Sequence, residues 1–165
     1  MLNVLEEKLA DAHGLAIAAS SLTGTVDRHV EDWILRDVLA ELRRDADETR
    51  RRCLALESSL GSDRADELLA HANTTAEHAR DLVAAWFKAG TDPVRAWTFL
   101  AMGEAGEVAA WSVLAELAGT GGDVSSLAAW GYDVQSRHLE LVLEAVPRLG
   151  RRTAAGFGEQ PGGRP

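Results

Sequence analysis

The chain is short of the features that mark secreted and membrane proteins. Its 165 residues include a single cysteine, Cys53, so no disulfide can form within the chain. The most apolar early run, residues 14–19, is far below the roughly 20 residues needed to cross a bilayer, and charges interrupt the later runs. The first residues, MLNVLEEKLADAH, carry acids where a secretory signal carries bases. We therefore expect a cytoplasmic protein that makes no membrane contact.

Basic residues are also scarce. Lys and Arg number 17 against 26 Asp and Glu, which gives a formal charge of -9 and a pI near 5.0. A nucleic-acid surface needs clustered, unopposed basic side chains. The densest basic run, residues 50–52, follows Asp45, Asp47 and Glu48 in the same expected helix, which favours a solvated face of ion pairs. The composition therefore argues against a nucleic-acid partner.

The chain lacks the alternating pattern of strands, and its apolar residues recur at helical spacing. We expect five helices, at about residues 2–22, from 27–33 to 60, 62–90, 93–118 and 123–147. The expected N-caps are Thr25 or Asp27, Ser62, Asp92 (followed by Pro93) and Asp123, and the expected stops are Gly61, Gly90, Gly119, and Pro147 with Gly150. Short connections predict antiparallel neighbours in an all-α bundle of four long helices plus a fifth, within one domain of residues 1–150. Residues 151–165, rich in Gly, Pro and Arg, are predicted to be a disordered tail.

Two carboxylates lie in the apolar stripe of the helix expected at 93–118. When this helix is numbered in sevens, Glu104 takes the same position as Trp97 and Trp111. Glu107 takes the same position as Leu100 and Leu114. Two buried carboxylates repel each other and lose hydration, so a proton, a basic partner or a cation must neutralise them. A rotated stripe, which would turn the pair toward solvent or a subunit groove, remains open as an alternative.

Other helices offer partners for these glutamates. Gln135 and His138, also three residues apart, lie on the inner face of the last helix. Asp45 and Glu48 have the same spacing on the second helix, at or beyond the border of its apolar stripe. A Glu-x-x-Glu helix that faces a Gln-x-x-His helix resembles half of a di-metal site in a bundle core.

A family resemblance rests on these motifs. The run GEAGEVAAWSVLAELAG resembles the helix signature of the ferritin-like superfamily, in particular the YciE/YciF-type stress-associated bundle proteins. Asp45-Ala-Asp-Glu48-Thr49 resembles that family's His-x-x-Glu-Thr, and residues 134–138 fall where the family has an acid-rich ligand segment. The likeness covers roughly residues 39–150 and implies a ferritin-like antiparallel four-helix bundle with a carboxylate-bound iron or manganese site. The chain departs from the family's ligands at Asp45, Ala105 and Gln135.

Two functional hypotheses follow. In the first, a divalent metal, iron or manganese, is bound for redox or stress-protection chemistry by Glu104, Glu107, His138, Asp45 and Glu48. Glu6 and His13, on the edge of the first helix, are further candidates. In the second, favoured by the ligand departures, a metal-free ferritin-like bundle acts as an oligomerising or protein-interaction module. Both include a homo-oligomer, and neither defines an enzymatic reaction.

Three glycines interrupt the helices that carry these motifs. Gly103 and Gly106 flank Glu104, and Gly131 lies within the last helix. Each costs about 1 kcal/mol relative to Ala in a helix interior, so a reason for its presence is expected. Close helix approach and room for a ligand both explain them.

Overall fold

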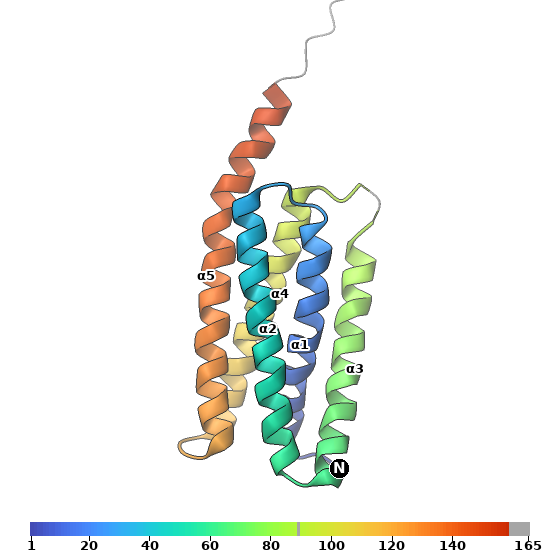
Figure 1. Ribbon diagram of the computed structural model, residues 1–165, viewed down its shortest axis with the longest axis vertical. Coiled ribbons are helices and arrows are strands. Elements are labelled where there is room, and N and C mark those ends of the chain that lie inside the picture. The colour runs from blue at the N-terminus through green and yellow to red at the C-terminus, as the bar shows by residue number, and fades with distance from the viewer. Residues whose placement is uncertain (89, 159–165) are drawn as a thin grey trace, which may run out of the picture.

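The computed structural model describes residues 1–88 and 90–158, and all regular structure in this part of the chain is α-helix. Five helices lie side by side along the long axis of the molecule (Figure 1). Their bounds are α1 (Val4–Asp27), α2 (Trp33–Ser59), α3 (Ser62–Trp86), α4 (Pro93–Ala118) and α5 (Asp123–Gly158). The prediction of an all-α protein with five helices is confirmed.

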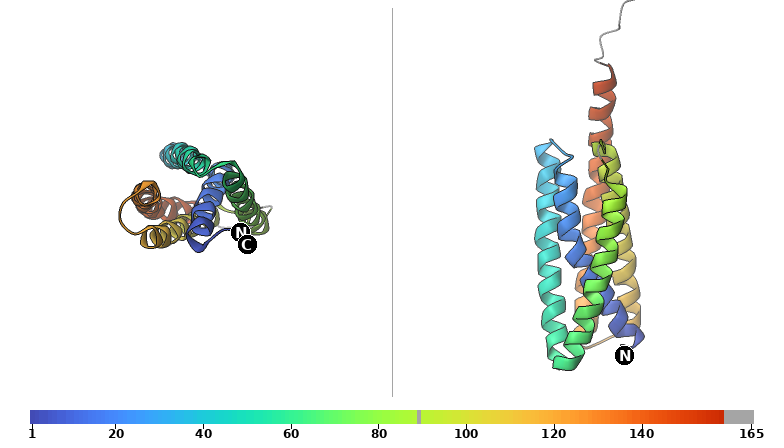
Figure 2. Two further views of the ribbon diagram at one scale, coloured as in Figure 1. Left: turned by 90° about the horizontal axis from the view of Figure 1, so that it is seen from below. Right: turned by 90° about the vertical axis from the view of Figure 1, so that its right-hand side faces the viewer.

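Four of the helices form a closed ring, and the remaining helix, α3, packs outside it. α1 contacts α2 and α4, and α5 contacts the same two helices, so the ring runs α1, α2, α5, α4. The chain goes up α1, down α2, up α3, down α4 and up α5 in Figure 1, so every neighbour in the ring is antiparallel. α3 packs against α1 and α2 instead (Figure 2). It connects the two halves of the ring and lies parallel to α1.

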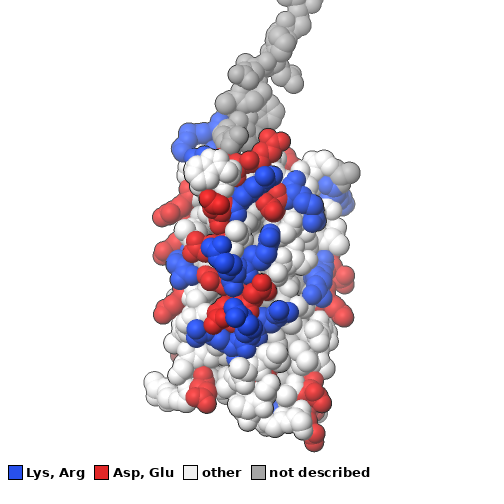
Figure 3. Space-filling view, in the orientation of Figure 1, with Lys and Arg blue, Asp and Glu red and all other residues white. Residues whose placement is uncertain are grey.

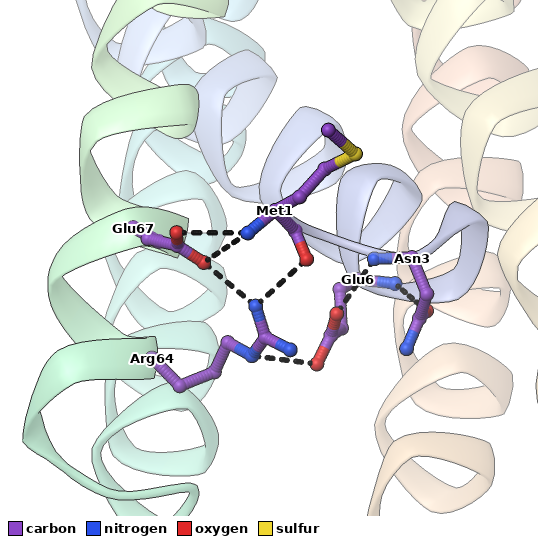
Figure 4. A network of polar contacts seen from close by, with 5 residues as sticks. All are labelled: Met1, Asn3, Glu6, Arg64 and Glu67. Carbon is purple, nitrogen blue, oxygen red and sulfur yellow. Dashed lines mark hydrogen bonds and ion pairs between the residues drawn. The ribbon is translucent and has the colours of Figure 1, made fainter.

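The contact between α1 and α3 depends on a glycine. A Cβ on Gly14 would lie 2.4 Å from the carbonyl oxygen of Ala72 and 2.7 Å from Cβ of Thr75, so only glycine permits this approach. The start of α1 is also tied to α3 (Figure 4). Arg64 of α3 lies 3.0 Å from Glu6 of α1, and Glu67 of α3 lies 3.0 Å from the N-terminal amine of Met1. α3 is therefore joined to α1 both at the start of the chain and at Gly14.

The start of α4 follows its sequence signal, whereas the end of α1 and the N-cap of α2 do not. Asp92 caps α4 by accepting a hydrogen bond from the Arg95 N–H at 2.9 Å, as predicted. The expected end of the first helix near residue 22 is wrong, since α1 continues to Asp27 and the Thr23 hydroxyl donates to the Ala19 carbonyl within the helix. The N-cap of α2 is Asp32, and neither Thr25 nor Asp27 has this role.

The ends of α3 also differ from the sequence prediction. Ser62 is the first residue of the helix, and Gly61, at φ 96°, holds the N-cap position without a side-chain hydrogen bond. The helix ends at Trp86, before the predicted stop at Gly90. The extra residues pass into the connection to α4.

The last helix does not end at Pro147 or Gly150. α5 continues to Gly158 and projects beyond the bundle (Figure 1). Pro147 has no N–H to donate to the Leu143 carbonyl. Both residues are exposed, so water can hydrogen-bond to that carbonyl instead. Arg148 fixes this turn by donating from Nε to Oδ2 of Asp32 at 2.6 Å. The predicted irregular tail is therefore helical over residues 151–158, and residues 159–165 lie outside the described part of the chain.

The surface of α2 carries mixed charge. Lys and Arg alternate with Asp and Glu over the face shown in Figure 3. Arg51 and Arg52 both pair with Glu48, at 2.8 and 2.7 Å, as expected for a solvated face of ion pairs. In the described ranges, no helix combines the length and apolar character needed to span a membrane.

Candidate functional site

A polar cluster lies halfway along the bundle, between two apolar parts of the core. One apolar part includes Leu35, Leu39, Trp97, Leu100 and Val142, and the other includes Leu9, Cys53, Trp111, Leu114 and Ala128. On α2, α4 and α5, inward-facing polar side chains lie between these two sets. We call them the mid-bundle cluster: Asp45, Glu104, Glu107, Gln135 and His138.

The two glutamates of α4 face inward, as the periodicity predicts. Glu104 is 3% exposed and Glu107 is 6% exposed, so the alternative that turned them toward solvent is wrong. Gln135 and His138 of α5 are each 2% exposed. The helical spacing alone brings these four side chains into the core.

His138 is the centre of the cluster. Its Nε2 atom lies 3.0 Å from Oδ2 of Asp45, and its Nδ1 atom lies 3.5 Å from Oε2 of Glu104. Asp45, at the border of the α2 stripe, turns inward to reach the imidazole and also accepts from Arg137 at the surface at 2.5 Å. A carboxylate therefore faces each ring nitrogen.

These contacts set the protonation of the cluster. Burial acts to lower the pKa of His138, but its contacts with Glu104 and Asp45 outweigh burial and raise that pKa above 6.5. Burial and the nearby charge of Glu104 raise the pKa of Glu107 well above 4.5. Both shifts favour the protonated forms of His138 and Glu107, which is the direction that neutralising two buried glutamates requires.

Three buried oxygens in the cluster have no hydrogen-bond partner. They are Oε2 of Glu104, Oε2 of Glu107 and Oε1 of Gln135. At 3.5 Å the approach of His138 to Glu104 is an ion pair without a hydrogen bond. Since an unsatisfied buried acceptor costs free energy, the cluster is stabilised less completely than the surrounding core.

The remaining predicted ligands lie elsewhere. Glu48 is on the surface with Arg51 and Arg52, so it does not join the cluster. Glu6 completes the capping box of α1, accepting from the Asn3 N–H at 2.7 Å.

His13 has a buried partner that the sequence reasoning missed. Its Nδ1 atom lies 3.0 Å from both carboxylate oxygens of Glu57, and the two side chains are 2% and 0% exposed. The sequence did indicate that Glu57 is buried, because it follows Cys53 by four residues and so lies on the same helix face. Cys53 is buried, and burial raises the pKa of its thiol, as expected for an inert cysteine.

The glycines near the cluster have different roles. A Cβ on Gly131 would lie 2.3 Å from Cε3 of Trp111, so this glycine admits the indole into the core. A Cβ on Gly106 would meet nothing within 4 Å. Gly103 and Gly106 instead line a groove between α1, α3 and α4, with Glu107 in its wall.

The donors of the cluster do not fit a two-metal site in this arrangement. Both nitrogens of His138 face carboxylates, Glu48 lies outside the cluster, and Gln135 contributes no charge. Within residues 1–88 and 90–158, no three His, Cys, Asp or Glu side chains are grouped so that they could hold one metal ion. An imidazolium cannot ligate a metal, so binding would first require His138 to release its proton and one carboxylate.

Comparison with known proteins adds no assignment. No family model matches the chain, and neither a curated protein nor a solved structure is similar to it at a significant level. Function is therefore argued from the geometry of the described residues.

Proposed function

We propose that this chain is a metal-free, ferritin-like helical bundle that works as a binding module and not as a di-metal enzyme. The observation that carries the proposal is His138, which has a carboxylate at each ring nitrogen. In that arrangement the position where a ferritin-like protein would bind metal is filled by an internal ion pair. Glu107 completes the neutralisation by keeping its proton.

The arrangement of the helices supports the ferritin-like part of the proposal. Ferritin-like bundles have one long crossover between two antiparallel helix pairs. Here α1 with α2 and α4 with α5 are such pairs, and the segment that crosses between them contains α3. The four-helix ring is thus made of α1, α2, α4 and α5, and the additional helix is the third in the chain.

Metal analysis tests the proposal. Protein purified without chelator is analysed for bound metal and then titrated with Fe²⁺ and Mn²⁺ in a calorimeter, for the natural chain and for Glu104→Ala with Glu107→Ala. We expect no stoichiometric metal and no difference between the two proteins. One or two ions per chain, lost in the double variant, would overturn the proposal in favour of the metal-binding hypothesis.

Self-association belongs to the same proposal. Several apolar side chains are exposed on α2 and α5, including Trp33 at 69%, Leu143 at 53% and Val146 at 46%. These two helices pack against each other, and exposed apolar side chains on adjoining helices are typical of contact surfaces. Sedimentation equilibrium of the natural chain and of Trp33→Ser is expected to show a weaker association in the variant, and a monomer in both cases would contradict the homo-oligomer.

A further inference from the structure

An apolar groove opens on the side of the bundle where α3 and α4 both pack on α1. α3 and α4 meet at one end of the groove, where the rings of Trp86 and Phe99 lie 5.0 Å apart, and beyond that contact the surface of α1 forms the floor between them. The groove has a volume of about 220 Å³. Its lining includes Ala18 and Leu22 of α1, Leu82 and Val83 of α3, and Met102 of α4.

Small residues keep this groove open. Ala18, Ala19, Gly103 and Gly106 line it where larger side chains would fill it. Since a Cβ on Gly106 would meet nothing within 4 Å, close helix packing does not explain this glycine. A glycine inside a helix lowers the stability of that helix, and at Gly106 the missing side chain leaves an open space in the groove.

Glu107 is the only residue with a charged side chain among the described residues that line the groove. It is 94% buried, since 6% of its surface is exposed, and its Oε2 atom has no hydrogen-bond partner. The neighbouring acids are matched, Glu104 by His138 and Asp45 by Arg137. Glu107 is the acid of the mid-bundle cluster without a basic partner.

We infer that the groove binds a small organic ammonium compound, whose apolar body lies against α1, α3 and α4 and whose cationic head pairs with the Glu107 carboxylate. The ammonium group supplies the basic partner that the ionised Glu107 carboxylate lacks. On binding, the carboxyl proton of Glu107 passes to solvent and the ammonium takes its place, so the charge of the buried cluster is unchanged. A neutral ligand of the same shape gains only the apolar contacts and a hydrogen bond.

The size of the groove suits a ring with a short arm. An apolar protein cavity of about 150 Å³ binds benzene. The groove is larger, at about 220 Å³, and its one polar group lies in the wall. Benzylamine, with an aromatic ring one carbon from its ammonium group, is therefore a suitable probe. Benzyl alcohol is its neutral counterpart.

The inference rests on the proposed binding function, and calorimetry on samples of measured metal content separates the two. Benzylamine and benzyl alcohol are each titrated into the natural chain, Glu107→Gln, Gly106→Leu and Gly150→Leu. The last variant is the matched control, because Gly150 is exposed and a Cβ there meets nothing within 4 Å. Circular dichroism checks that each variant is folded.

We expect benzylamine to bind the natural chain and the control with a dissociation constant of about 1 mM or below. Glu107→Gln should weaken benzylamine at least about tenfold while leaving benzyl alcohol within about twofold, because only the ammonium depends on the charge. Gly106→Leu should abolish binding of both probes. Equal binding of benzylamine to the natural chain and Glu107→Gln, or no binding in metal-free natural protein, overturns this inference alone, whereas bound metal overturns the proposed function first.

Discussion

Two buried histidines in the same bundle have opposite surroundings. His13 meets a single acid, Glu57, with both carboxylate oxygens at 3.0 Å, and the pair is closed to solvent. His138 meets two acids, Asp45 and Glu104, and a third acid of the same cluster, Glu107, lies in the wall of a groove without a basic partner. In the His13 region, Glu57 has its basic partner. In the His138 region, Glu107 has none and could pair with a cation from outside. Counting the partners of each buried acid therefore separates a structural pair from a candidate site.

The largest effect is expected at the closed pair. Glu57→Ala leaves the His13 imidazole buried without its partner, which should lower the free energy of unfolding by about 3 kcal/mol or more. Urea denaturation followed by circular dichroism measures the change. Replacing both members, as His13→Leu with Glu57→Met, should restore most of the stability, since the volume is kept and no polar group is stranded. A double variant as unstable as Glu57→Ala would show that the pair is not an isolated unit.

The two regions also differ in what a methyl group does at a helical glycine. Gly131→Ala brings a Cβ to 2.3 Å from the Trp111 ring and should lower the free energy of unfolding by about 2 kcal/mol. Gly106→Ala enters open space and should raise it by about 1 kcal/mol, the usual gain in an exposed helix. Thermal denaturation of the two variants side by side decides. Destabilisation by Gly106→Ala would mean that the groove is narrower than described.

Within the mid-bundle cluster, the two glutamates should respond with opposite sign. Glu104→Gln removes the charge that faces His138 and should destabilise the fold by on the order of 1 kcal/mol. Glu107→Gln removes an acid whose raised pKa opposes ionisation and should stabilise the fold by a similar amount at neutral pH. Above pH 4.5 the unfolded carboxyl ionises while the folded one resists ionisation, so the cost of Glu107 appears as the pH rises above 4.5 and the gain from the substitution should vanish below it. Changes of the same sign in denaturant unfolding would contradict the pairing described for His138.

The smallest effect is a pH dependence at His138. Because its folded pKa lies above 6.5, the stabilisation by its proton is complete below that pH and is lost as pH rises through the raised pKa. The free energy of unfolding should therefore fall as the pH rises above 6.5, and less steeply in His138→Gln. Proton NMR of the imidazole gives the pKa directly. A value at or below 6.5 would contradict an imidazolium held between Asp45 and Glu104.

The sequence predicted the burial of Glu104, Glu107 and His138 because each lies on the apolar face of a long, regular helix. It also placed Asp45 at the border from which it turns to His138. It could not predict that His13 meets Glu57, since 44 residues separate them and the contact depends on how α1 and α2 align. The groove was equally hidden, because it depends on α3 packing outside the ring.

Helix boundaries were predictable where a local sequence signal is not opposed by contacts with the rest of the molecule. Asp92 followed by Pro93 acts within one turn, and α4 begins there. Pro147 gives an equally clear local stop, but α5 passes through it because the Arg148 contact with Asp32 and an exposed proline face favour continuation. At Pro147 a tertiary contact thus outweighs the local signal.

The parallel packing of α1 and α3 has a consequence for how the molecule opens. Two parallel helices cannot pair as a simple hairpin, so α1 meets α3 only after α2 has reversed the chain between them. The same α1 also packs on α4, and α4 pairs with α5. A helix packed against three other helices loses its hydrogen bonds only when all of them separate. The amides of α1 should thus exchange with solvent as slowly as the whole molecule unfolds, while the projecting turns of α5 exchange first.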